Sequence, residues 1–244
     1  MARVAPNIPA LTDLLCEHCG YTLNGLPADA RCPECGALLR DSVDDGRAPS
    51  PWEAPGPRGR ASAFVATTMA VLLRPTGFFR HLSARVPGQA ARRFAWAHAT
   101  LTSMLFGFTA MGYWLIVSGE RFGGWKDPII FLGGLACSIG SLALITPLAA
   151  RLTSWEGSYR GLRLPLETVR RCLDYHTAHY LPVAALFAIT TALFLWQRDR
   201  TATVAGFQLS VAYLYLLSAE VVATAAYLFW TYWIGMRNVM FANR

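Results

Sequence analysis

Long apolar runs separated by short polar loops fill the second half of the chain. Four such runs lie at residues 94–117, 128–150, 180–196 and 203–234. A helix needs about 20 residues to cross the roughly 30 Å hydrocarbon core of a bilayer, and each run reaches or approaches that length. Tyrosine and tryptophan cluster near several run ends, as they do in the interfacial layers of a membrane. The pattern predicts an all-α integral membrane bundle of four transmembrane helices over residues 94–234.

The apolar stretches before these runs are shorter and are interrupted by charged residues. Residues 61–73 are apolar but too few to span a bilayer, and Arg74 and Pro75 end the stretch. The next segment, TGFFRHLSARV, has cations between apolar residues at helical spacing, which are Phe78, Phe79, Leu82 and Val86. Such a pattern is typical of a helix in the membrane interface, and a short soluble helix also fits it. We expect an interfacial helix within residues 61–93, and leave open whether 61–73 enter the membrane.

Composition and charge support a membrane location. Hydrophobic residues make up 54% of the 244 residues and charged residues only 15%, whereas soluble domains carry about a quarter charged residues. The net charge is +7, and the basic residues are unevenly placed. Fourteen lie in segments 58–93 and 151–178 and after residue 234, against four in loops 118–127 and 197–202.

This asymmetry predicts the orientation of the chain. Because basic residues concentrate in cytoplasmic loops, both termini and the 151–178 loop are expected on the cytoplasmic side of the cytoplasmic (inner) membrane. The arginines are then expected to face the anionic headgroups of the lipid bilayer. No nucleic-acid partner is needed to explain the basic charge.

Polar segments divide the N-terminal quarter. Residues 1–15 form a tail in which Asp13 interrupts the best apolar stretch, so no signal peptide is expected. Residues 16–40 contain four of the six cysteines. Residues 41–60 contain four prolines and three glycines, which predicts a flexible linker. At the other end of the chain, residues 235–244 form a cytoplasmic tail.

Two Cys-x2-Cys pairs in CEHCGYTLNGLPADARCPECG carry the clearest chemistry. Cys16 and Cys19 are followed, after twelve residues, by Cys32 and Cys35, and a glycine follows each pair. Four thiolates at this spacing can close a tetrahedral site around one metal ion, with no position left for water. In the reducing cytoplasm such pairs more often bind metal than form disulfides. We expect a small zinc ribbon with β-knuckles over residues 16–40, which folds as it binds metal.

The cysteine motif resembles zinc ribbons and also the rubredoxin-like domain of rubrerythrins, in which CxxCGY precedes CPxCG. The second resemblance implies iron and electron transfer, since four cysteine sulfurs suit either metal. Rubrerythrins join that domain to a di-iron helical bundle with Glu-x-x-His motifs, and this sequence contains none. Zinc is therefore the favoured metal, and iron is the alternative.

Two further resemblances concern the cysteine segment and, separately, residues 70–234. The cysteine segment is similar to the CxxCGYxLxGL…CPECG ribbon that heads many membrane proteins of planctomycete-type bacteria. Downstream, LLRPTGFFRHL and VRRCLDYHTAHYLPVAALF resemble the Yip-domain membrane family, whose members typically have five spans rather than four. Eukaryotic Yip proteins act in membrane trafficking through small-GTPase partners, and a shared fold alone does not transfer that function.

Few ionisable side chains fall inside the apolar runs. Glu220 lies deep within the fourth run, where charged groups are costly and often mark functional sites. His98 and His179 lie near the cytoplasmic ends of the first and third runs, and His176 precedes His179 by three residues. These side chains could form a buried ion pair, or bind a metal or haem. A structural Glu–His hydrogen bond is the favoured interpretation.

No catalytic motif is found in the sequence, since GxSxG, HExxH and P-loop patterns are absent. We therefore expect a non-enzymatic membrane protein whose ribbon engages a protein partner or stabilises an assembly. Pairs of small residues within the runs leave a homo-oligomer open. One alternative is an electron-transfer protein with iron in the ribbon and a haem or quinone between helices. A weaker alternative is a transporter with Glu220 as a proton-coupled site.

Overall fold

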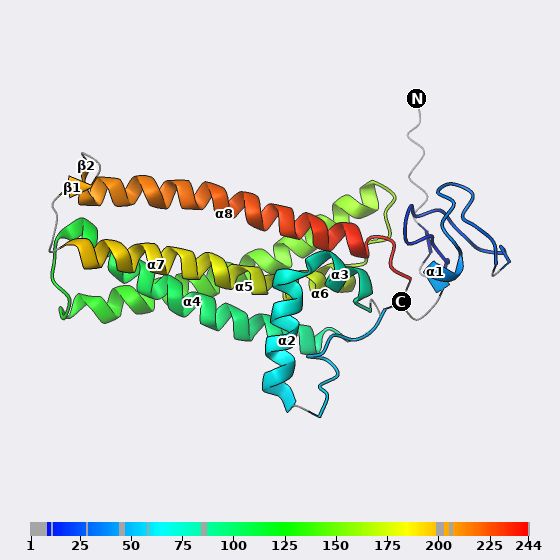
Figure 1. Cartoon of the computed structure of the whole chain (residues 1–244), viewed down its shortest axis with the longest axis horizontal. Helices are drawn as coiled ribbons and strands as arrows, with labels where there is room; N and C mark the ends of the chain where they lie inside the picture. The colour runs from blue at the N-terminus through cyan, green and yellow to red at the C-terminus, as the bar shows by residue number, and fades with distance from the viewer. Residues whose placement is uncertain are drawn as a thin grey trace. The chain divides into compact units, whose positions relative to one another are not determined.

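The computed structural model of the protein describes residues 9–10, 12–27, 29–43, 47–57, 59–83, 87–198, 203–204 and 207–243. Parts of all six predicted segments lie outside these residues: 1–8 and 11 of the tail, 28 of the ribbon, 44–46 and 58 of the linker, 84–86 of the interfacial segment, 199–202 and 205–206 of the transmembrane domain, and 244 of the C-terminal tail. The described chain is mostly helical (Figure 1). In order, its elements are α1 (Arg40–Val43), α2 (Gly59–Leu73), α3 (Pro75–His81), α4 (Gln89–Ser118), α5 (Lys126–Tyr159), α6 (Leu166–His176), η1 (Thr177–His179), α7 (Tyr180–Arg198), β1 (Thr203–Val204), β2 (Phe207–Gln208) and α8 (Leu209–Val239).

Four helical segments are long and apolar enough to cross a membrane, which confirms the prediction of a multi-span helical protein at that level. They are α4, α5, α8 and the continuous stretch Leu166–Arg198, in which η1 joins α6 to α7. The helices extend beyond the apolar runs, because the polar residues that flank each run can also adopt helical conformation. For example, α5 continues to Tyr159, past the run that ends at residue 150.

The segment before α4 forms two helices joined at a sharp bend. α2 and α3 meet at 115°, and together they are apolar enough to form a broken span or a re-entrant loop. Pro75 begins α3, and a proline at the first helical position fixes the backbone angle there without removing a helix hydrogen bond. The described residues therefore contain four candidate spans, or five if the bent pair counts as one, and whether residues 61–73 enter the membrane stays open.

The start of the fourth predicted span differs from the prediction. β1 and β2 pair antiparallel, with Thr203 opposite Gln208 and Val204 opposite Phe207, and α8 begins only at Leu209. β-branched residues such as Thr203 and Val204 favour strands over helices. A short hairpin therefore occupies the beginning of the apolar run at 203–234.

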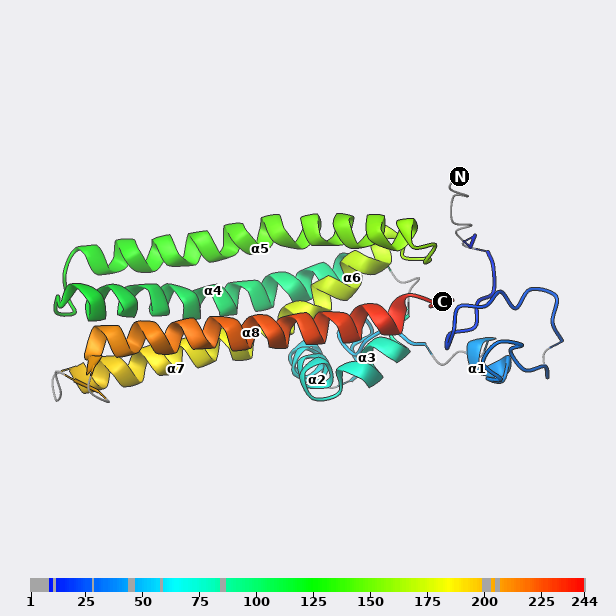
Figure 2. The same cartoon turned by 90° about the horizontal axis from the view of Figure 1, so that it is seen from above.

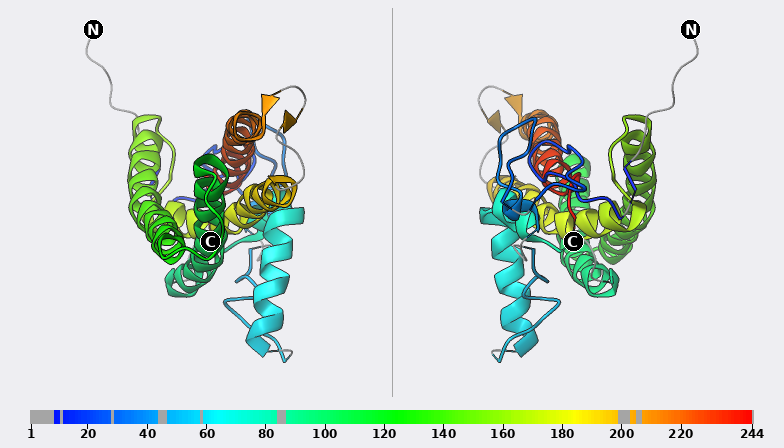
Figure 3. Two further views of the ribbon diagram at one scale, coloured as in Figure 1. Left: turned by 90° about the vertical axis from the view of Figure 1, so that its left-hand side faces the viewer. Right: turned by 90° about the vertical axis from the view of Figure 1, so that its right-hand side faces the viewer.

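The chain divides into two compact units, and we describe each by itself. The first, which we call the span unit, comprises residues 95–145 and 177–231. Its long helices lie side by side (Figures 2 and 3): α5 packs on α4, and α4, α7 and α8 contact one another. α4 and α5 approach closely at Gly134, where a Cβ would lie only 2.7 Å from the Cβ of Ala110. The missing side chain of the glycine therefore permits this approach. Small residues at such contacts are typical of helix packing in membranes.

The second unit, which we call the anchor unit, comprises residues 1–94, 146–176 and 232–244. An aromatic cluster lies in its core, with neighbouring ring centroids 5.1–6.2 Å apart. The rings belong to residues distant in sequence, which are Trp52, Phe64, Phe78, Phe94 and Tyr175. Aromatic pairs at these separations stabilise a fold beyond the area that they bury.

Residues 47–57 were predicted to belong to a flexible linker, but the structure packs part of this segment against the anchor unit. Ala48 forms a parallel bridge with Leu82. The Trp52 indole donates a 2.7 Å hydrogen bond to the carbonyl of Ala90, and the Ser50 hydroxyl lies 2.7 Å from that of Tyr175. Proline and glycine content predicted flexibility here, whereas one half-buried tryptophan and a few specific polar contacts supply the packing.

Candidate metal centre

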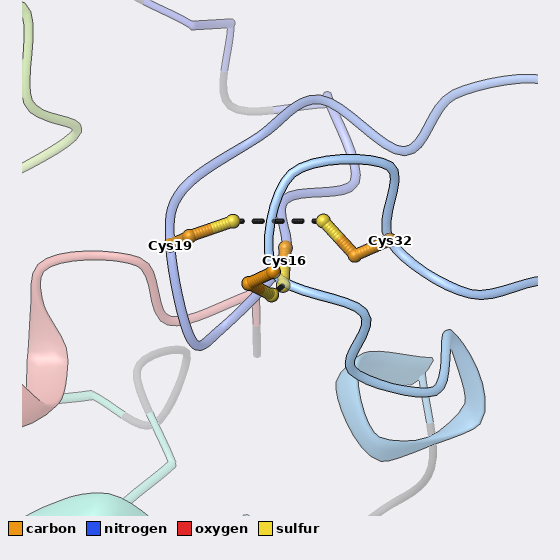
Figure 4. A group of neighbouring side chains, drawn as sticks. Cys16, Cys19 and Cys32 are labelled. Carbon is orange, nitrogen blue, oxygen red and sulfur yellow. Dashed lines mark hydrogen bonds between the residues drawn. The ribbon is translucent and has the colours of Figure 1, made fainter.

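The four N-terminal cysteines bring their sulfur atoms together. The Sγ atoms of Cys16, Cys19, Cys32 and Cys35 all lie within 4.8 Å of one another, and all four thiols are free of disulfides. The Sγ–Sγ distance is 3.5 Å between Cys16 and Cys35 and also between Cys19 and Cys32. Figure 4 shows the sulfurs of Cys19 and Cys32 pointing toward each other. Zn–S bonds of about 2.3 Å place four sulfurs on a tetrahedron with edges of roughly 3.8 Å. The cluster therefore has the size that one metal ion requires.

Two turns of similar geometry, offset by 16 residues, present these thiols. In each turn the amide of the first cysteine donates to the carbonyl five residues later. The glycine after the second cysteine donates back to the carbonyl of the first. These four bonds measure 2.7–2.9 Å and join Cys16 with Tyr21, Gly20 with Cys16, Cys32 with Ala37 and Gly36 with Cys32. A single antiparallel bridge closes each turn, Leu15 with Thr22 and Arg31 with Leu38.

The glycine after each cysteine pair is required by the backbone. Gly20 has φ 81° and Gly36 has φ 73°, in the left-handed region that side chains disfavour. Gly20 has a second constraint, because a Cβ there would overlap the ring of Phe241 in the C-terminal tail. Gly36 meets no atom within 4 Å of such a Cβ. The first turn is therefore in contact with the C-terminal tail as well as with the second turn.

Backbone amides point at the sulfurs from inside the turns. Amides two and three residues after the first cysteine of each turn donate to its sulfur; they belong to His18, Cys19, Glu34 and Cys35. Burial raises the pKa of the Cys16 thiol despite these donors. Burial also raises the pKa of the Cys32 thiol, but the amides of Cys35 and Glu34 outweigh it and lower that pKa to about 7. The Cys32 thiol is therefore more readily available as a thiolate than those of Cys16 and Cys19, whose pKa values are raised.

The apolar core around the thiols is very small. Its buried members are Cys16, Leu23, Cys32 and Leu39. Four further residues pack against them, which are Leu14, Leu26, Ala37 and Val43. So few apolar side chains cannot offset the conformational entropy of ordering about 25 residues. The cysteine domain therefore depends on a metal ion or on contacts with the rest of the anchor unit.

Arg47 provides such contacts. Its Nε lies 2.9 Å from Oε1 of Glu17, which stands between the first two cysteines, and its side chain is only 7% exposed. The same guanidinium donates to the carbonyls of Phe79, Leu82 and Asn238 at 3.0–3.2 Å. One arginine therefore joins the cysteine domain, the end of α3 and the end of α8.

Asn243, in the C-terminal tail, binds the other side of the first turn. Its side-chain amide donates to the carbonyl of Leu15 at 2.7 Å and to that of Ser42 at 3.0 Å. Its side-chain oxygen accepts from the amide of Leu15 at 2.8 Å. These bonds give the backbone next to Cys16 partners from the opposite end of the chain.

Arg163, which follows α5, completes the attachment and is 6% exposed. It donates to the carbonyls of Ala10 and Asp13 at 3.1 and 2.6 Å. It also donates to the Ala242 carbonyl and the Asn243 side-chain oxygen, both at 2.9 Å. We call Arg47, Arg163 and Asn243 the docking residues, since each bonds both the cysteine domain or its tail and another part of the anchor unit.

The residues singled out inside the apolar runs are also buried. Glu220 is 8% exposed on α8; its Oε1 accepts a hydrogen bond from Thr190 of α7, where a histidine partner was expected. Its Oε2 has no hydrogen-bond partner among the described residues. The Nδ1 of His179 lies 2.7 Å from the Tyr227 hydroxyl, and His98 and His176 are buried in α4 and α6. Within the described chain, the thiols are the one group of three or more potential ligands that converges on a metal-sized site.

Sequence reasoning identified the thiols but missed the docking residues. Arg47 lies in a proline-rich segment, and Asn243 lies in a short tail with no recognisable motif. Arg163 was counted only as one of the basic residues that set orientation. The 16-residue repeat of the two turns was a detectable signal, since LLCEHCGYTL and ARCPECGALL share their cysteine, glycine and final leucine positions.

Comparison of the chain with models of known protein families, with characterised proteins and with solved structures finds no match.

Proposed function

We propose that the chain is a multi-pass protein of the cytoplasmic membrane with a structural zinc ribbon on the cytoplasmic side, and that it serves as a non-enzymatic interaction or membrane-organising scaffold. The observation that carries this proposal is the cluster of four thiols held against the anchor unit by the docking residues. A metal there stabilises the ribbon, and the ribbon in turn orders the ends of the chain.

A structural zinc ion suits the cluster better than a catalytic metal ion does. Four sulfurs within 4.8 Å of one another saturate a tetrahedral ion. A closed site leaves no position for a substrate or an activated water. Zinc carries no redox chemistry, which fits a structural role. Iron in the same sulfur set remains the alternative, and would make the ribbon an electron-transfer domain.

An interaction role is supported by what the docked domain leaves exposed. Tyr21 is 40% exposed on the first turn, and Arg31 and Glu34 are exposed on the second. The glycine-containing side of the first turn packs under the tail, at Phe241. A protein partner at the membrane surface could therefore contact the second turn and Tyr21 without displacing the docking residues.

Metal analysis of the purified full-length protein tests the proposal. We expect about one zinc per chain and no visible colour. Cys32→Ser should lose most of the metal, whereas Cys137→Ser, which removes an exposed cysteine of α5, should keep it. One iron per chain with visible absorbance after aerobic purification would replace the zinc proposal with the electron-transfer alternative.

The scaffold role needs a separate measurement. Proteins cross-linked to wild type in membranes should be lost from Cys32→Ser while the variant stays at wild-type abundance in the membrane fraction. A Tyr21→Ser variant that keeps its zinc should lose the same partners. If both variants retain every cross-linked protein, the ribbon does not mediate an interaction.

A further inference from the structure

A groove in the anchor unit lies between the C-terminal ends of α5 and α8. Its volume is about 110 Å³. Its apolar lining comes mainly from the loop after α5 and from α8, namely Leu162, Leu164, Trp233, Met236 and Met240. The Tyr232 hydroxyl lies 2.7 Å from that of Thr153, so the two helices are joined beside the groove.

The loop after α5 is folded back so that it forms one wall. Gly161 has φ 76°, and the amide of Leu162 donates a 2.8 Å hydrogen bond to the carbonyl of Gly157. A Cβ at Gly157 would lie 3.0 Å from Leu164, so the glycine permits this close approach. The wall is therefore built by the local sequence and does not require a ligand to form.

Three charged side chains line the same groove. Arg160 and Glu156 form an exposed ion pair with 2.6 Å between Nη2 and Oε1. Arg237 is exposed, and its guanidinium makes no hydrogen bond or ion pair with the described residues. Two arginines against one glutamate leave a positive charge beside an apolar groove. A cation near a helix C-terminus also interacts favourably with the helix dipole, so Arg237 by itself does not indicate a ligand.

Exposed aromatic side chains belong to the same turns of α5 and α8 as the groove residues. Trp155 is 70% exposed, Tyr159 67% and Trp233 50%. Tryptophan and tyrosine favour the headgroup layer of a membrane, where one end of the ring is apolar and the other is wet. Because the 151–178 loop and the tail are predicted to be cytoplasmic, this aromatic group marks the cytoplasmic headgroup layer.

We propose that this groove binds one anionic phospholipid, with its phosphate between Arg160 and Arg237 and the upper part of an acyl chain against Leu162, Leu164 and Met236. The charge of the arginines complements a phosphate, and the apolar wall complements a hydrocarbon chain. In the headgroup layer, phosphate groups and the upper ends of acyl chains are both within reach of the groove. The inference rests on the membrane placement in the proposed function, but not on the metal.

Native mass spectrometry of the delipidated, full-length protein tests this site. The ligands are dioleoylphosphatidylglycerol, dioleoylphosphatidylcholine and, as headgroup alone, glycerophosphoglycerol. We expect the anionic lipid to bind at least about tenfold more tightly than the zwitterionic lipid, and the headgroup alone to bind negligibly. Arg237→Gln and Arg160→Gln should each weaken binding of the anionic lipid by about fivefold.

Two variants make the test specific. Arg151→Gln removes an exposed arginine of α5 outside the groove and should change binding less than about twofold. Glu156→Gln removes the one acid of the groove and should tighten binding of the anionic lipid, an effect that a purely structural role does not predict. Equal weakening by Arg151→Gln and Arg237→Gln, or equal binding of the two lipids, overturns the proposal. Zinc content measured on the same samples shows whether the metal proposal stands independently.

Discussion

Arg171 and Glu53 lie 118 residues apart in the sequence and form a buried ion pair, with 2.6 Å between Nη2 of the arginine and Oε2 of the glutamate. A second bond joins Nε to Oε1 at 2.9 Å, so the contact is bidentate. The side chains are 3% and 2% exposed. Glu53 also accepts from the amide of Ser50, and the pair therefore fixes the segment after the cysteine domain to α6.

Glu53→Gln should destabilise the anchor unit strongly. The substitution leaves the Arg171 guanidinium buried without a countercharge, and breaking a buried pair in this way costs about 3–5 kcal/mol. We expect the thermal midpoint in detergent to fall by on the order of 10 °C. Proteolysis within residues 47–57 should also become faster.

The matched control for this prediction is Glu156→Gln. That substitution breaks an ion pair whose side chains are 61% and 55% exposed, and exposed pairs contribute about 0–1 kcal/mol. Its thermal midpoint in a zwitterionic detergent should stay within about 2 °C of wild type. If the Glu53 variant is no less stable than this control, the segment at 47–57 is not held by the pair.

Arg47→Met should release the cysteine domain without removing its metal. The substitution keeps the length of the side chain but loses the ion pair with Glu17 and the bonds to three carbonyls. Because no cysteine changes, metal content should stay at about one ion per chain. Limited proteolysis should then cut near residues 40–47 faster than in wild type.

Arg40→Gln is the control for this release, because Arg40 is exposed and its side chain makes no hydrogen bond or ion pair with the described residues. Its proteolysis rate should match that of wild type. Loss of metal from the Arg47 variant would show instead that docking and metal binding form a single folding step. An unchanged cleavage rate would show that Arg47 does not hold the domain in place.

Removing the metal should unfold the cysteine domain and leave the span unit helical. In the proposed zinc site thiolates are the ligands, so protons compete with the metal for the sulfurs. The metal-bound state is therefore present at high pH and is lost as the pH falls. Burial raises the pKa of Cys16, and that of Cys19 to about 12, so metal binding at neutral pH must also release protons.

Proton release and metal release can be measured together. Titrating zinc into the metal-free protein in weak buffer with a pH-sensitive dye should show protons released at neutral pH. Lowering the pH of the loaded protein should release zinc to a chromogenic chelator while the helical circular dichroism signal stays nearly constant. Zinc binding without proton release would argue that thiols are not its ligands.

The sequence was sufficient to predict the helices and the thiol cluster because both depend on local patterns. An apolar run of about 20 residues can be recognised without knowing its neighbours. The spacing of Cys16, Cys19, Cys32 and Cys35 likewise limits where the sulfurs can lie. These are properties of short segments, and the structure agrees with them at that level.

Contacts between distant segments could not be predicted in the same way. Arg171 has the same charge and a similar setting as Arg170, and only the fold decides which of them meets Glu53. Composition predicted flexibility around Trp52, since it averages over prolines and glycines and ignores one well-placed aromatic ring. The partner of Glu220 was also missed, because a threonine on the neighbouring helix gives no sequence signal that separates it from other threonines.

The contact between Glu220 and Thr190 leads to a last prediction. Glu220 accepts from Thr190, and no cation bonds to it among the described residues, although it is 8% exposed on a candidate span. A buried polar atom that loses its hydrogen-bond partner costs stability, because it is not solvated by water either. Glu220→Gln keeps an acceptor for the threonine and should change stability by less than about 1 kcal/mol. Thr190→Val leaves Oε1 without its donor and should cost about 1–3 kcal/mol.

Thermal unfolding of both variants in the same detergent tests this structural role of Glu220. A loss of stability in Glu220→Gln as large as that in Thr190→Val would indicate that the carboxyl group itself is required there, and not only an acceptor for Thr190. Proton flux in vesicles tests the transporter alternative separately. If wild type carries a flux that Glu220→Gln abolishes at unchanged stability, Glu220 is a proton-coupled site and the scaffold proposal is incomplete. Absence of flux in both proteins leaves the hydrogen bond with Thr190 as the role of this side chain.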